Sequence, residues 1–92
     1  MEPISRPSLA EIVAGKIADM ILSNIYRSGY QLPSERDLVK QFGISRTTLR
    51  EALKLLEDAA LIEVRHGVGS FVTELTNTSL LKAHELADKT AA

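Results

Sequence analysis

Residues 32–54 have the sequence LPSERDLVKQFGISRTTLREALK, which contains two helix starts separated by one helix stop. Ser34 is a favoured N-cap, and Gly43 suits the left-handed conformation in which many helices end. Ser45 provides a second N-cap almost at once, so a short helix is followed by another over about 46–59. Two separately capped helices joined by a tight glycine turn are typical of a helix-turn-helix.

The second helix of this pair is expected to have an apolar side and a cationic side. At 100° per residue, its apolar residues fall together on one side: Leu49, Ala52, Leu53 and Leu56. The opposite side is polar and carries Thr47, Arg50, Glu51 and Lys54, with Arg46 on its flank. Because the major groove of B-DNA admits one α-helix, a helix of this kind could enter it with its polar side outward.

These helices offer two kinds of contact to a duplex. A guanidinium group can donate two hydrogen bonds to O6 and N7 of guanine, so Arg46, Arg50 and, from the preceding helix, Arg36 are candidates for base contacts. Short hydroxyls and the N–H groups at a helix N-terminus suit phosphate oxygens instead. The candidates at that helix start are Ser45, Thr47 and Thr48.

An amphipathic helix is expected over residues 8–24, ahead of the helix-turn-helix. Ser8 and Glu11 have the spacing of a capping box, which marks its start. Asn24 can adopt the left-handed conformation that would stop it. Residues 25–26 are then expected to fold back over the core.

Two short strand-like runs, 61–65 and 70–73, follow the helix-turn-helix and predict a β-hairpin. Its glycine-containing connection would project His66 and Gly67, which could approach a sugar, a phosphate or a minor-groove acceptor. Residues 31–32 can supply a third short strand. The expected fold class is therefore mainly α with a small β-hairpin (α+β), a winged helix-turn-helix of three helices plus a wing.

Length and composition limit the classes of protein to which this chain can belong. Ninety-two residues at 10.1 kDa, 45% hydrophobic and 25% charged, suit one small folded domain. The net charge of −1 gives no global reason to expect nucleic-acid binding, although residues 36–54 are locally basic. The absence of cysteine, the two isolated histidines and the lack of a long apolar run favour a cytoplasmic protein with no cofactor, no metal and no membrane partner.

The sequence changes character after the hairpin. We expect residues 8–73 to form the DNA-binding domain and residues 74–92 to be a linker and the start of a helix that belongs to an absent C-terminal effector domain. That helix would carry a stripe with no cover inside the chain, formed by Leu80, Leu81, His84 and Ala87.

Three blocks at residues 32–38, 42–53 and 61–72 resemble the N-terminal DNA-binding domain of GntR-family bacterial transcriptional regulators, especially the FadR-like subfamily. The resemblance implies a homodimer that binds a pseudo-palindromic DNA operator, with a small-molecule effector on the missing C-terminal domain. It also implies a role for each candidate residue. The major-groove arginines would be Arg36, Arg46 and Arg50, the phosphate-side threonines Thr47 and Thr48, and the minor-groove wing tip His66 with Gly67.

Other interpretations of the cationic helix remain open. Its basic residues could form an ordinary solvated surface, paired with the acidic residues Glu51, Glu57 and Asp58 of the same helix. The winged fold could then be a protein–protein interaction module without DNA binding. An enzyme is not expected, because no catalytic set is evident and no histidine is placed to activate Ser34.

Overall fold

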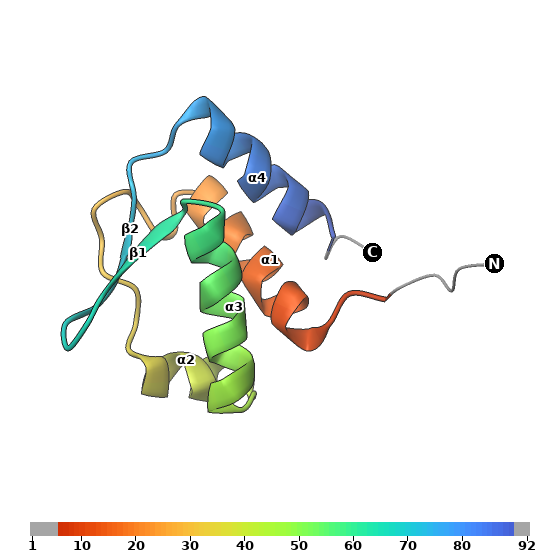
Figure 1. The fold of residues 1–92 in the computed structure, drawn as a ribbon, viewed down its shortest axis with the longest axis vertical. Helices are drawn as coiled ribbons and strands as arrows, with labels where there is room; N and C mark the ends of the chain where they lie inside the picture. Colours follow the sequence, from red (N-terminus) through yellow and green to blue (C-terminus); the bar gives the residue numbers. More distant parts are fainter. Residues whose placement is uncertain (1–5, 90–92) are drawn as a thin grey trace.

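The computed structural model describes residues 6–89, in which four helices surround a small core and a β-hairpin projects from one side (Figure 1). The elements, in chain order, are α1 (Leu9–Leu22), α2 (Glu35–Phe42), α3 (Arg46–Asp58), β1 (Ile62–Arg65), β2 (Gly69–Val72) and α4 (Asn77–Asp88). This confirms the winged helix-turn-helix of three helices and a hairpin, to which α4 is an addition.

The first three helices begin at the serines that the sequence indicates. Ser8 forms a full capping box, because its hydroxyl accepts from the Glu11 N–H at 3.1 Å and its own N–H donates to the Glu11 carboxylate at 3.0 Å. Ser34 and Ser45 each accept from the N–H three residues later, at 3.1 and 3.0 Å. Gly43 ends α2 at φ 64°, so the tight turn between the two motif helices is confirmed.

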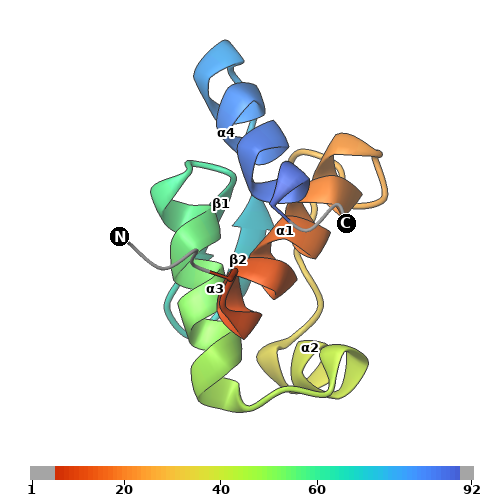
Figure 2. The same ribbon diagram turned by 90° about the vertical axis from the view of Figure 1, so that its right-hand side faces the viewer.

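The core lies where α1 passes beside α3 and below α4 (Figure 2). α1 packs against both of these helices, and α3 also contacts α2 and β1. The largest fully buried apolar side chains come from α1, α2, α3 and the turn before β1: Ile17, Ile21, Leu38, Leu49, Leu56 and Leu61. The apolar side predicted for α3 therefore faces the core, which leaves its polar side outward.

The segment after α1 differs from the expectation at one residue. α1 ends at Leu22, and Asn24 adopts the predicted left-handed conformation at φ 62°. Tyr26 packs against the core, but Ile25 is 63% exposed, so the prediction that both residues cover the core was wrong for Ile25. The backbone explains the difference, because the N–H groups of Ile25 and Tyr26 both donate to the Met20 carbonyl and this turn directs the first side chain outward.

α4 packs on α1 through a different face from the stripe that the sequence indicated. Ser79 and Ala83 are buried in the contact, whereas Leu81 is 63% exposed and His84 is also exposed. The small side chain of Ala83 allows the two helix backbones to approach each other. α4 is thus covered within the chain through Ser79 and Ala83, while the predicted stripe is exposed at Leu81 and His84 and half-buried at Leu80 and Ala87.

The wing is a two-stranded antiparallel hairpin with Ile62 opposite Val72 and Arg65 opposite Gly69. The third strand predicted at residues 31–32 is reduced to one bridge, between Gln31 and Phe71. Additional backbone hydrogen bonds continue on either side of this bridge, including one of 2.8 Å from Leu32 to Ser70. The segment before α2 therefore lies along β2.

A tight turn joins α3 to the wing. Ala60 adopts the left-handed conformation at φ 60°, which is uncommon for a residue with a side chain. Its N–H donates to the Glu57 carbonyl at 2.9 Å, and its carbonyl accepts from the Thr73 hydroxyl at 2.6 Å. The turn thus holds the end of α3 to the end of β2.

Candidate nucleic-acid interface

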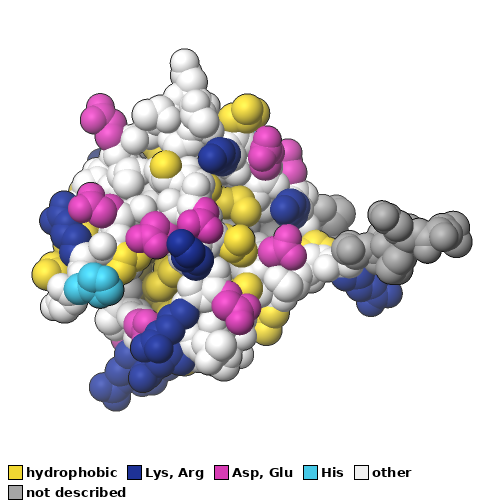
Figure 3. Space-filling view, viewed as in Figure 1, with side chains coloured by type: hydrophobic (Ala, Val, Ile, Leu, Met, Phe, Trp, Pro, Cys, Tyr) yellow, Lys and Arg dark blue, Asp and Glu magenta, His cyan; other side chains and the backbone are white. Residues whose placement is uncertain are grey.

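Basic side chains gather at the end of the molecule that carries α2 and the start of α3 (Figure 3). The side chains of Arg46 and Arg50 are each 64% exposed on α3, and Arg36 is exposed in the first turn of α2. Opposite them on α3, Leu49 and Ala52 are completely buried. The buried face fixes the orientation of the helix, so both α3 arginines lie on its outer side.

A single carboxylate joins the two arginines of α3. Glu35, the first residue of α2, lies 3.2 Å from Nε of Arg46 through its Oε1. The same carboxylate accepts from Arg50 at both oxygens, from Nε at 3.2 Å and from Nη2 at 3.1 Å. These hydrogen bonds, and then the charge of Glu35, raise the pKa of Arg50 above its ordinary value. Both guanidinium groups are therefore held side by side by a residue of the neighbouring helix.

The sequence did not single out Glu35. The alternative interpretation paired the basic residues of α3 with acidic residues on the same helix, and the structure bears this out for Lys54, which lies 3.0 Å from Asp58. That contact raises the pKa of Lys54. The arginines instead pair across the turn with α2, a contact between residues that are 15 positions apart for Arg50. No periodic or capping signal indicates such a pair.

The hydroxyl-bearing candidates at the start of α3 differ in their surroundings. Ser45 uses its hydroxyl in the N-cap, accepting from the Thr48 N–H and donating to the Thr48 hydroxyl at 2.9 Å. Thr48 is half-buried as a result, whereas Thr47 is exposed. Thr47 is thus the hydroxyl of this group that is available at the surface, and the other two shape the helix start.

The wing tip lies beside α3 and presents the other two candidates. His66 and Gly67 are exposed, and Gly67 has φ 74°. The Val68 N–H donates to the Arg65 carbonyl at 3.0 Å, which closes a four-residue turn with glycine at its third position, as a type II turn prefers. The Arg65 guanidinium lies 4.4 Å from the centre of the Phe71 ring, so it covers the face of the hairpin.

A cleft of about 790 Å³ separates α3 from the wing. Basic groups line both of its sides, with Arg50 and Lys54 on α3 and Arg65 and His66 on the wing. A polyanion crossing this cleft would meet positive charge from each side. The structure therefore brings one predicted helix candidate, Arg50, and both wing candidates, His66 and Gly67, to the lining of one cleft, which the other predicted candidates do not line.

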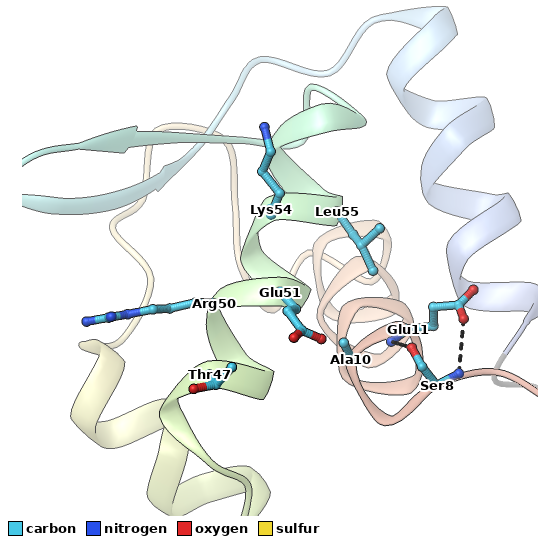
Figure 4. Close-up of a pocket in the computed structure, with 8 residues that line it drawn as sticks. All are labelled: Ser8, Ala10, Glu11, Thr47, Arg50, Glu51, Lys54 and Leu55. Atoms are coloured by element: carbon cyan, nitrogen blue, oxygen red, sulfur yellow. Dashed lines mark hydrogen bonds between the residues drawn. The ribbon is translucent and has the colours of Figure 1, made fainter.

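A shallower hollow of about 630 Å³ lies between the start of α1 and α3 (Figure 4). Glu51 points toward α1 there, whereas Arg50 extends in the opposite direction, toward α2. The Ser8 and Glu11 side chains at its edge are engaged in the capping box. Thr47 and Arg50, two of the candidates for DNA contacts, also line this hollow.

Metal binding and membrane insertion are not supported within residues 6–89. No group of three or more histidines and carboxylates in this range could hold a metal ion. None of the helices in the same range combines the length and the hydropathy needed to cross a bilayer.

The sequence of this domain matches known proteins. Residues 9–72 match the model of the bacterial regulatory proteins of the gntR family. An uncharacterized HTH-type transcriptional regulator of Mycobacterium tuberculosis is 42% identical over 85 residues, which are 89% of this chain and 35% of that protein. The histidine utilization repressor of Klebsiella aerogenes is 41% identical over 81 residues, 87% of this chain and 34% of the repressor. The chain thus spans about a third of the length of these relatives.

Solved structures share the fold as well. BusR of S. agalactiae in complex with its busAB promoter DNA has a TM-score of 0.73 and 25% identity, covering 91% of this chain and 38% of that chain. The DNA-binding domain of AraR in complex with an operator has a TM-score of 0.67 and 31% identity, covering 79% of this chain and 90% of that chain. Both similar structures were therefore determined with DNA bound.

Proposed function

The chain belongs to the GntR family of bacterial regulatory proteins, and from this premise we propose that it is the sequence-specific DNA-binding domain of a FadR-like transcriptional regulator. α3 enters the major groove of an operator, and the wing reaches the adjacent minor groove. The relatives are transcriptional regulators, in agreement with a protein that is not an enzyme.

The pair of arginines held by Glu35 carries this proposal. Recognition of guanine is stronger when the direction of the guanidinium group is fixed before binding, because a free side chain must otherwise be ordered on contact. Arg46 and Arg50 are exposed on α3, and one carboxylate orders both. An arginine face that served only solubility would have no need of such a contact between two helices.

The remaining candidates divide into phosphate and minor-groove contacts. Thr47 and the free N–H groups at the start of α3 face the backbone of the duplex, and Arg36 reaches the same groove edge from α2. Ser45 and Thr48 contribute by holding the helix start in place. His66 and Gly67 enter the minor groove, where the missing side chain of glycine permits a close approach.

We further propose that residues 8–73 form the DNA-binding domain and residues 74–92 lead into a C-terminal domain. That domain would bind a small-molecule effector and dimerise the protein, so that two copies of α3 read a pseudo-palindromic operator. The length of the matched relatives supports this proposal, because they are about three times as long as the stretch that matches this chain. α4, which packs on α1, would be the link between the two parts.

Selection of bound sequences from a random duplex pool tests the proposal. We expect a recurring motif with guanines, and Arg46→Ala or Arg50→Ala should then relax discrimination at one base pair by about 5- to 150-fold. Thr47→Ala should weaken binding to selected and scrambled duplexes alike, because a phosphate contact carries no sequence information. Equal losses on both duplexes for the arginine variants would contradict the assignment.

A protein–protein interaction module is the second candidate function. The salt dependence of binding distinguishes the two candidate functions. When phosphate contacts dominate, the logarithm of the binding constant falls with the logarithm of the salt concentration, with a slope near −0.9 per neutralised phosphate in B-DNA. A chain that enriches no duplex from the pool at about 50 mM salt would favour the interaction module.

A further inference from the structure

The outer half of the wing has no core beneath it. The side chains of residues 63–68 are exposed, and an isolated two-stranded hairpin is at best marginally stable in water. The place of the wing tip relative to α3 must therefore be fixed by hydrogen bonds to the body of the domain.

Gln31 supplies such a hydrogen bond from the segment before α2. Its Nε2 donates to the Val68 carbonyl at 2.9 Å, across 37 positions of sequence. Its backbone forms the bridge to Phe71, so the residue is anchored on β2 while its side chain reaches the turn. Among the described residues, no other side-chain hydrogen bond joins the turn at 66–68 to the rest of the domain.

Gly69 completes this contact. A Cβ atom at Gly69 would clash with Nε2 of Gln31, so the amide group occupies the space that any other side chain would take. Gly69 also has φ 141°, a conformation that L-residues rarely adopt. At Gly67, by contrast, an added Cβ would meet nothing within 4 Å. The two wing glycines therefore differ, and Gly69 is the one that makes room for Gln31.

We propose that Gln31 is the positioning residue of the wing. Its amide holds the Val68 carbonyl, and through it the turn at His66 and Gly67, in a fixed position beside α3. The inference deepens the proposed function and rests on it for its consequence, which is that Gln31 controls how strongly the wing tip adds to DNA binding without touching the duplex itself.

The first test needs no DNA. We would compare backbone ¹⁵N order parameters of the 92-residue chain with those of Gln31→Leu, which removes the donor but keeps most of the side-chain volume. At 66–68 they should fall from about 0.85, typical of a rigid backbone, to below about 0.6, with those of the helices unchanged. Gln41→Leu, the same change at an exposed position of α2, should leave them unchanged. An unaltered wing turn in Gln31→Leu, or an equal loss of order throughout the domain, would overturn the proposal.

A second test measures the consequence for DNA. On a duplex selected from the random pool, Gln31→Leu should raise Kd by about 2- to 12-fold, the equivalent of one net hydrogen bond. The variant and the wild type should bind equally well to a shorter duplex that lacks the base pairs under the wing. An equal loss on both duplexes would refute a role in the wing. If no duplex binds the wild-type chain, the proposed function fails, while the order parameters still decide the role of Gln31.

The variant Gly69→Ala provides an independent test of the proposal. Because its new methyl group displaces the Gln31 amide and its backbone is strained at φ 141°, it should mobilise the same turn at least as much, and the double variant should lose little more than Gly69→Ala alone. Fully additive losses would show that the two residues act separately, against the proposal.

Discussion

Replacing Glu35 with glutamine should reduce the ability of the domain to distinguish its selected duplex from unrelated DNA. The carboxylate forms an ion pair with Nε of Arg46 at 3.2 Å and accepts hydrogen bonds from Nε and Nη2 of Arg50 at 3.2 and 3.1 Å. Glutamine keeps one acceptor oxygen and turns the other position into a donor, so it cannot hold both guanidinium groups. Each arginine that must be ordered on binding costs about 2- to 12-fold in affinity, so the two together cost roughly 5- to 150-fold.

Binding to unrelated DNA should change in the opposite direction. The variant loses one negative charge beside the phosphates, so its affinity for a scrambled duplex should rise and its salt dependence should become steeper. The stability of the fold should barely change, because exposed ion pairs contribute little to it. Fluorescence anisotropy with selected and scrambled duplexes over a salt series measures both affinities, and thermal unfolding checks the fold.

Glu51→Gln is the matched control, because it removes the same charge from α3 at a residue that does not hold the two arginines. If Glu35→Gln and Glu51→Gln shift both affinities equally, the effect is one of net charge alone. That result would refute the idea that Glu35 orders the arginines.

Three further predictions concern stability. Leu56→Ala should lower the free energy of unfolding by about 2–5 kcal/mol in urea titrations, because the side chain is fully buried. Gly43→Ala should cost about 1–2 kcal/mol with an unchanged urea m-value, because φ is 64° and an added Cβ meets nothing, leaving backbone strain as the cause. The Ser8 N–H, with help from Lys89, lowers the pKa of Glu11 below its ordinary value of 4.5, so the carboxylate stabilises the fold above that pH and the effect is lost as pH falls through the lowered pKa. The Tm deficit of Glu11→Gln should accordingly be full at pH 7 and shrink below pH 4.5, and a constant deficit would contradict this.

The helix starts were predictable from the sequence because a cap is a local arrangement. Ser8, Ser34 and Ser45 each bond to an N–H only three residues away, and Gly43 ends α2 through its own backbone freedom. Such contacts depend on a few neighbouring residues and not on the rest of the chain. The order of elements followed from them, and with it the side of α3 that faces outward.

Contacts between elements were harder to predict. The pairing of Glu35 with the α3 arginines depends on the angle between two helices, which no spacing along the chain encodes. The face of α4 that packs was missed for a related reason, because the buried residues Ser79 and Ala83 are small and give a weaker hydrophobic signal than the exposed Leu81. The hydrogen bond from Gln31 to Val68 links residues 37 positions apart and was equally hidden.

Ala60, which adopts the left-handed conformation at the junction of α3 and the wing, affects how freely these two parts can move relative to each other. Holding an L-residue at φ 60° costs about 1–2 kcal/mol, while glycine in its place would add about 0.4–1 kcal/mol of chain entropy to be lost on folding. An exchange of Ala60 for glycine should therefore leave the stability unchanged or raise it by up to about 1.6 kcal/mol. Alanine and glycine at position 60 should differ mainly in how stiff they make the turn. With its methyl group Ala60 has few alternative backbone angles, which restricts how far the wing can move relative to α3.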